Sequence, residues 1–176
     1  ADREAIAAEL AGIEAGLAEA RTALAALDGE AATLERALAA GRRDEDRILD
    51  QLRVAPGYEA ALAAALGGDL DAGTNKDAAR SWGGAEPGKD DPALPAGTRP
   101  LAEFVTAPAA LARRLAQVAV VDADDGQPLD VGQRLVTTDG VMRRWDGFVA
   151  RGDGGTATER LQRQNRLDAL AAQRPQ

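Results

Sequence analysis

Apolar residues recur along the first third of the chain with the spacing of a coiled coil. Alternate steps of four and three residues, starting at Ile6, visit fourteen positions up to Leu52, and twelve of these are apolar. Charged residues fall between them, as on the solvent side of a helix that supercoils around a partner. Because a globular helix rarely exceeds about 20 to 25 residues without a cap, the pattern favours a coiled-coil arm over residues 1–52 rather than an amphipathic helix on a globular core.

The two exceptions in this apolar seam are neighbours. Gly41 and Glu45 occupy consecutive seam positions inside the charged stretch 41–46. Glycine weakens a helix and an acid is costly in an apolar seam, so we expect the coil to loosen there.

Turn-forming residues divide the middle of the chain into short elements. Pro56-Gly57 ends the arm, and residues 58–66 read as a short helix that stops at Gly67. Residues 69–100 are rich in Gly, Pro and Asp, which predicts a long surface loop. A second helix is expected over residues 108–117.

Two β-type runs follow this second helix. Val118–Val121 is typical of a buried strand, and residues 134–138 form another, ended by the hairpin-type turn Asp139-Gly140. Strands and helices alternate irregularly, so we predict an α+β or α/β globular domain over residues 53–155.

The last segment is predicted to be helical again. Leu161, Leu167 and Leu170 fall near one face between residues 156 and 173, although Gln164 and Asp168 interrupt a strict heptad seam. We therefore expect residues 156–176 to be a returning helix, giving an outgoing arm, a globular tip and a shorter return.

Composition excludes most catalytic chemistry. The 176 residues include no histidine and no cysteine, which rules out Ser-His-Asp and Cys-His nucleophilic sites and nearly all structural zinc sites. We expect no enzyme activity, cofactor, metal or small-molecule substrate. No apolar run reaches membrane-spanning length and no signal segment opens the chain, so we expect a cytoplasmic protein. With Ala1 first and Met142 the only methionine, we expect a piece of a longer protein.

Two motifs point to chemistry that their context does not support. Residues 83–89 have the glycine and lysine spacing of a phosphate-binding loop, but Asp90 replaces the Ser or Thr, and neither a preceding strand nor a following helix is predicted. Asp122, Asp124 and Asp125 lack the ligand pattern of a calcium loop, and adjacent acids such as Asp124 and Asp125 favour a solvated turn over a carboxylate-dependent hydrolase.

Three stretches resemble the hinge of SMC proteins, the bacterial chromosome-condensation ATPases, and specifically alphaproteobacterial members. They are residues 52–67, residues 100–115 and residues 134–140 with the glycines that follow. The family's hinge closes with a glycine, six residues, another glycine, three residues and a glycine pair. Gly140 and Gly147 fit this series, whereas Arg151-Gly152 stands where the family has the pair.

The resemblance implies a homodimerisation hinge for a ring that acts in chromosome condensation and segregation. It places ATPase heads outside this chain and the protein at the nucleoid. The glycine series implies a dimer interface, because residues without side chains let two edge strands approach each other. The expected interface residues are Gly140, Gly147, Phe148, Val149 and Gly152.

A local DNA contact is a second expectation. The net charge of −8 is unsuited to coating nucleic acid, but the balance reverses from Arg134 onward, with eight arginines against five acids. The candidate DNA-binding residues are Arg143, Arg144, Arg151, Arg160, Arg163 and Arg166. Trp145 beside them is suited to stacking on an unpaired base, or to packing in a core. The same arginines are equally suited to pairing with acids of the first arm.

A different class of function also fits the first arm. The long seam is compatible with a coiled-coil adaptor that binds another protein through residues 1–52 and has no chromosomal role. The location of the association interface, in the tip or in the coil, distinguishes the two hypotheses.

Overall fold

The computed structural model describes residues 2–40, 46–152 and 155–173. The chain divides into two compact units, residues 1–41 with 166–176 (unit 1) and residues 42–165 (unit 2). The predicted loosening at residues 41–46 lies outside the described residues, apart from Asp46. Within the described part, no helix is long and apolar enough to cross a membrane.

Unit 1 is dominated by the α1 helix, which spans Asp2–Ala40. Its seam residues in the N-terminal half are largely exposed, from 61% at Ile13 to 39% at Leu24. Ala31 and Leu38 are buried, as is Leu170 of the α5 helix, Gly155–Gln173, whose last turns belong to this unit. The predicted terminal helix is confirmed.

The helix does not follow the heptad pattern up to Leu52. Asp46 and Arg47 are not helical, and Ile48–Gln51 is a separate four-residue helix, α2, in unit 2. Ile48 is fully buried and Leu52 is 1% exposed, both in the core of that unit. The heptad pattern placed Ile48 and Leu52 in a coil seam, but the core of unit 2 covers them instead.

Unit 2 is built on a five-stranded mixed sheet. Its strands are β2 (Arg99–Pro100), β4 (Val118–Val121), β5 (Arg134–Thr137), β6 (Met142–Arg144) and β7 (Val149–Ala150), hydrogen-bonded in the order β2-β4-β5-β6-β7. Only the β4–β5 pair is parallel. The predicted α+β fold and both predicted strands are confirmed, and Asp139-Gly140 lies in the turn between β5 and β6.

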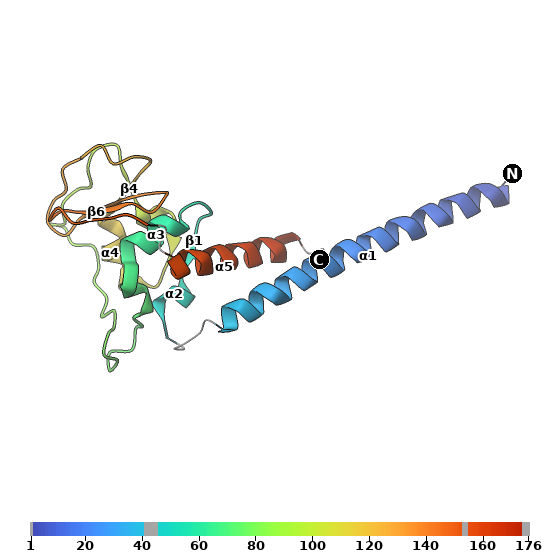
Figure 1. Ribbon diagram of the computed structural model, residues 1–176, viewed down its shortest axis with the longest axis horizontal. Coiled ribbons are helices and arrows are strands. Elements are labelled where there is room, and N and C mark those ends of the chain that lie inside the picture. Colours follow the sequence, from blue (N-terminus) through green and yellow to red (C-terminus); the bar gives the residue numbers. More distant parts are fainter. Residues whose placement is uncertain (1, 41–45, 153–154, 174–176) are drawn as a thin grey trace. The chain divides into compact units, whose positions relative to one another are not determined.

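Short helices cover this sheet. The α3 helix, Glu59–Leu66, ends at Gly67, whose φ of 54° is in the left-handed region that glycine tolerates. The α4 helix, Ala112–Ala116, follows the 3-10 turn η3, Ala109–Leu111. In Figure 1, α3 and α4 lie with β4 and β6 inside unit 2. Both helices were predicted.

The remaining elements of unit 2 are short. Strands β1 (Arg53–Val54) and β3 (Val105–Thr106) form a separate antiparallel pair. The 3-10 turns η1 (Gly67–Asp71) and η2 (Leu101–Glu103) precede and follow the long predicted loop, most of which is irregular. Asp46 anchors its start, because its carboxylate accepts hydrogen bonds from the amides of Thr74 (2.8 Å) and Asn75 (2.7 Å). These bonds lower the pKa of Asp46.

The first half of α5 is fixed to unit 2 by apolar and polar contacts. Leu161 is 2% exposed in the core. Arg160 forms an ion pair with Asp50 at 2.6 Å, and the Asn165 side-chain amide donates to Glu59 at 2.7 Å. The chain segments that enter and leave unit 2 are therefore tied to the same small core.

Candidate functional site

The β6–β7 hairpin holds the predicted interface residues Gly147, Phe148 and Val149. Its turn is closed by a hydrogen bond from the Gly147 amide to the Arg144 carbonyl at 3.1 Å. Gly147 has a φ of 85°, a conformation that L side chains rarely adopt. The glycine is therefore required by the hairpin turn itself.

Strand β7 is the last strand of the described sheet. The Arg144 amide donates to the Phe148 carbonyl at 2.9 Å, so Phe148 faces β6 through its backbone. Backbone direction alternates along a strand, which turns the peptide groups of Val149 away from β6. Among the described residues they have no hydrogen-bond partner, so they offer a donor and an acceptor at the edge of the sheet.

Three apolar side chains are exposed in the β6–β7 hairpin. The exposed fractions are 47% for Trp145, 49% for Phe148 and 37% for Val149. We call these three residues the β7 edge patch. An open strand edge with exposed large apolar side chains is typical of a strand that pairs with another chain.

The other two predicted interface glycines differ in exposure: Gly140 is buried and Gly152 is exposed. Gly140 has a φ of 92° and is buried in the β5–β6 turn, where its amide donates to the Thr137 carbonyl at 3.1 Å. Gly152 is exposed just after β7. Apart from its chain neighbours, no atom of the described residues lies within 4 Å of a Cβ built on Gly147 or Gly152, so these positions leave room for a second molecule.

Arg143, a predicted DNA contact, is engaged within the chain. Its guanidinium forms two hydrogen bonds to the Asp124 carboxylate, at 2.7 and 2.8 Å, and a third to the Gln127 carbonyl at 2.8 Å. The Arg143 side chain is 19% exposed. Its hydrogen bonds lower the pKa of Asp124, which in turn raises the pKa of Arg143.

Four other predicted DNA contacts also form ion pairs. Arg144 binds Asp146 in its own hairpin at 2.6 Å, which lowers the pKa of Asp146 through the hydrogen bond. The remaining pairs are Arg160 with Asp50, Arg163 with Glu159 and Arg166 with Glu30. Glu30 belongs to the α1 helix, whereas Asp50 lies in α2 of unit 2, so the prediction of pairing with the first arm is confirmed for Arg166. Arg151 lies exposed at the end of β7.

The acidic turn after β4 has a structural role that the sequence did not reveal. Asp124 also accepts a hydrogen bond from the Gly126 amide at 3.0 Å, besides those from Arg143. Its carboxylate therefore joins the turn to β6. No signal in the sequence pairs these residues, because the contact depends on the sheet. Among the described residues, no group of three or more acidic, histidine or cysteine side chains could hold a metal ion.

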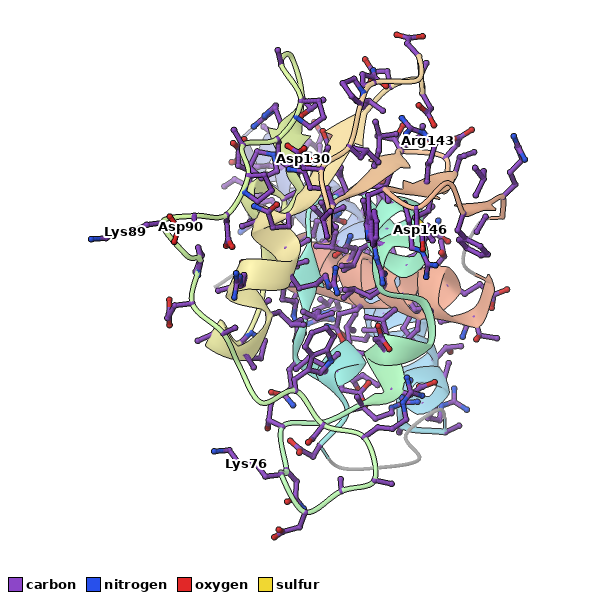
Figure 2. All side chains as sticks on the ribbon, turned by 90° about the vertical axis from the view of Figure 1, so that its left-hand side faces the viewer. Lys76, Lys89, Asp90, Asp130, Arg143 and Asp146 are labelled. Carbon is purple, nitrogen blue, oxygen red and sulfur yellow. The ribbon has the colours of Figure 1, made fainter. Side chains whose placement is uncertain are left out.

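The phosphate-loop motif lies in irregular structure. Figure 2 shows Lys89 and Asp90 on an outer loop of unit 2, with Lys89 directed away from the fold. Asp91 accepts from the Gly88 amide at 2.8 Å and from Arg113, which lowers the pKa of Asp91. Figure 2 also places Arg143 and Asp146 on the ribbon of the last strands.

Comparison with known proteins identifies close relatives of the chain. It is 42% identical over 177 aligned positions, 94% of this chain, to the chromosome partition protein Smc of Rhodopseudomonas palustris. It is 46% identical over 132 positions, 70% of this chain, to the protein of the same name from Cereibacter sphaeroides. The chain spans 15% and 11% of the lengths of these relatives. No family model matches it.

A solved structure has the same fold. An asymmetric dimer of the SMC hinge domain from Geobacillus stearothermophilus superposes with a TM-score of 0.62 at 21% identity, covering 90% of this chain and 85% of that one. The two relatives supply the sequence relationship, and the solved structure supplies the fold. This chain belongs to the bacterial Smc family and has the fold of the SMC hinge domain, with helical segments at both ends.

Proposed function

We propose that this chain is a homodimerisation hinge that joins two coiled-coil arms in an SMC ring acting in chromosome partition. The observation that carries the proposal is the β7 edge patch, an open strand edge with exposed Trp145, Phe148 and Val149. Two copies that pair through this edge would satisfy the outward peptide groups of Val149 and bury the apolar side chains. The name of the solved Geobacillus structure, a hinge dimer, supports this assembly.

The proposal assigns the α1 helix and the last turns of α5 to the two arms, and residues 42–165 to the hinge. Gly147, Phe148, Val149 and Gly152 would lie at the interface, and the buried Gly140 would shape the turn that presents β6. This chain would catalyse no reaction of its own. The solved structure that it resembles is a hinge domain, and hydrolysis of ATP would belong to heads outside this chain.

The proposal keeps a local DNA contact at the nucleoid, in the cytoplasm. Among the six arginines predicted from sequence, Arg144 and Arg151 are the best placed, because they are adjacent in space or sequence to the β7 edge patch. Arg144 would have to exchange a carboxylate for a phosphate, and so would Arg143, Arg160, Arg163 and Arg166.

Gly147→Glu tests the proposed interface, and Gly126→Glu is its matched control. Both glycines are exposed, have a positive φ (85° and 78°) and would place a Cβ in open space. Each substitution should cost about 1 to 2 kcal/mol of stability through backbone strain. Only the first should raise the dimer dissociation constant, by about tenfold or more, measured by sedimentation equilibrium.

Equal effects of the two substitutions on the dimer would contradict an interface at β7. Loss of the dimer after removal of residues 1–40, with Gly147→Glu still dimeric, would favour the coiled-coil adaptor. Circular dichroism of Gly147→Glu and Gly126→Glu should show the helix content of the parent.

A further inference from the structure

The first half of α5 has few apolar contacts with unit 2. Among the described residues, its members of the unit 2 core are Leu161, which is 2% exposed, and the smaller Ala157, which is partly buried. These two residues are four positions apart and lie on one narrow stripe of the helix. Hydrophobic burial is non-directional, so a helix held by one large apolar side chain loses little buried surface when it rotates or slides. Polar contacts must therefore fix its orientation.

Arg160 supplies one polar contact between α5 and unit 2. Its Nε donates to Oδ1 of Asp50 at 2.7 Å, and its Nη2 lies 2.6 Å from the same oxygen. The Arg160 and Asp50 side chains are only 13% and 11% exposed. Water and salt therefore screen this ion pair weakly, and the loss of one partner would be costly.

Asp50 is itself held by a second buried arginine. Arg47, with a side chain 9% exposed, donates from Nη2 to Oδ2 of Asp50 at 3.3 Å and from Nη1 to Oδ1 of Asp71 at 3.4 Å. The shorter contacts of Arg47 with Asp50 go to Oδ2, whereas Arg160 binds Oδ1. We call Arg47, Asp50, Asp71 and Arg160 the Asp50 cluster. It joins α2, η1 and α5, which are distant in the sequence.

The segment that carries this cluster is closely packed against the start of the long loop. The Ile48 amide donates to the Ala72 carbonyl at 2.9 Å. A Cβ built on Gly73 would lie 2.5 Å from the Asp46 carbonyl oxygen, so only glycine fits there without a shift of the backbone. The Asp50 cluster therefore stands on a tightly packed base.

A second polar contact lies five residues further along α5. The Asn165 side-chain amide donates to Oε1 of Glu59 at 2.7 Å, and the other oxygen of this buried carboxylate accepts from the Gly57 amide at 2.8 Å. Residues five apart in a helix are separated by about 140° around the axis and about 7.5 Å along it. Two such contacts define both the rotation of α5 and its position along its own axis.

We propose that the Asp50 cluster, together with Asn165 and Glu59, sets the orientation of α5 on unit 2. Buried ion pairs contribute little net stability compared with apolar side chains of the same volume, but their hydrogen bonds require one geometry. Arg160 is a positioning residue, and Asp50 is the fixed point to which it is attached. This inference goes beyond the proposed hinge function, because it does not depend on the association of two copies.

Hydrogen exchange of the full chain tests the attachment of α5. Arg160→Gln should lower the protection of the α5 amides by about tenfold or more, as expected for the loss of a hydrogen bond between charged groups. The amides of β4 and β5 should keep their protection, because α5 would open locally while the sheet stays folded.

Arg163→Gln is the matched control. It removes the same charge from the same helix, but the ion pair of Arg163 with Glu159 is exposed, with side chains 43% and 60% accessible. Its loss should change the protection of α5 little.

A distance measurement tests orientation separately from attachment. The chain has no cysteine, so spin labels can be confined to Gln162→Cys and Ala102→Cys, both at exposed positions of unit 2. An excess of unlabelled chain suppresses distances between copies. The parent should give one narrow distance distribution and Arg160→Gln a broad one. Arg160→Lys keeps the charge but not the planar fork, so it should regain part of the protection of α5 while its distribution stays broader than that of the parent.

Three results would overturn the proposal. Equal losses of protection in α5 and in β4 and β5 would mean that the ion pair supports the folding of unit 2 as a whole. Equal effects of Arg160→Gln and Arg163→Gln would mean that burial of the pair is irrelevant. A narrow distance distribution in Arg160→Gln would mean that apolar contacts alone orient the helix. Mass measurements on the same samples report the dimer separately, so either proposal can fail alone.

Discussion

The two edges of the five-stranded sheet differ in how they meet solvent. At one edge, Phe148 directly before β7 is 49% exposed and Val149 within β7 is 37% exposed. At the other edge, β2 consists of Arg99 and Pro100. Both strands are two residues long and both are terminal in the described sheet, so strand length does not distinguish them.

The β2 edge carries features that prevent pairing with another chain. Pro100 has no N–H to donate. Arg99 pairs with Glu103 at 2.6 Å and lies over the Phe104 ring at 4.4 Å, so a charged group covers the nearby aromatic surface. Phe104 in turn stacks on Tyr58 at 3.8 Å between ring centroids. Proline and charge are common devices that keep an edge strand unpaired.

The β7 edge has a similar charged pair but no proline. Its hairpin has one ion pair, Arg144 with Asp146, and Arg144 lies over the Phe148 ring at 4.7 Å, but about half of that phenylalanine remains exposed. The contrast indicates that one edge is protected and the other is available for association. The same sheet thus favours a single pairing surface, as a closed two-fold dimer requires.

Removing the apolar character of β7 should have the largest effect on association. Phe148→Lys combined with Val149→Lys replaces two exposed apolar side chains with charges, and the two-fold axis repeats each change. Since burial of each apolar side chain contributes about 1.5 to 3 kcal/mol, the dimer dissociation constant should rise by about 100-fold or more. Sedimentation velocity over a range of concentrations measures it.

Val131→Lys is the control for this double substitution. Val131 is 73% exposed and precedes β5, which β6 separates from β7 in the sheet. It should leave the dimer unchanged. A dimer that survives the double substitution at Phe148 and Val149 would show that exposure at β7 has another cause.

The elements that could be predicted from sequence are those with a local signal. Helix α3 follows Pro56-Gly57 and ends at Gly67, and β4 is a run of four apolar residues before an acidic turn. In both elements, the apolar pattern and the residues that begin or end the element are close together in the sequence. The α1 helix was predictable for the same reason, from its heptad spacing.

The missed features depend on contacts between distant parts of the chain. Strands β1, β2 and β3 have two residues each, and only their partners make them strands. Spacing placed Ile48 and Leu52 in a coil seam, whereas the core of unit 2 covers them. Charge counts singled out Arg143, but the fold pairs it with Asp124 and leaves Arg134 without an ion pair in the described chain.

Converting β2 into an unprotected edge should produce a smaller effect. Arg99→Val with Pro100→Val adds an N–H and exposes the Phe104 ring that Arg99 covers. We expect weak, concentration-dependent association beyond the dimer, with a gain of about tenfold or less in apparent affinity, because β2 is short. Light scattering should then report masses above the dimer. An unchanged mass would mean that Arg99 and Pro100 do not protect this edge.

The smallest effect is expected in α1, whose seam is exposed like the β7 edge patch. Leu10 and Leu17 are 54% and 48% exposed, and lysine has a helix propensity similar to that of leucine. If the hinge dimer forms at β7, Leu10→Lys with Leu17→Lys should change its dissociation constant by about twofold at most, as for surface substitutions of about 0.5 kcal/mol. Sedimentation measures the dimer, and circular dichroism should show unchanged helix content. The coiled-coil adaptor predicts the opposite order, since association would then depend on this seam. Monomers in this variant, together with dimers in the Phe148→Lys and Val149→Lys variant, would place the interface in the arm and refute the hinge dimer.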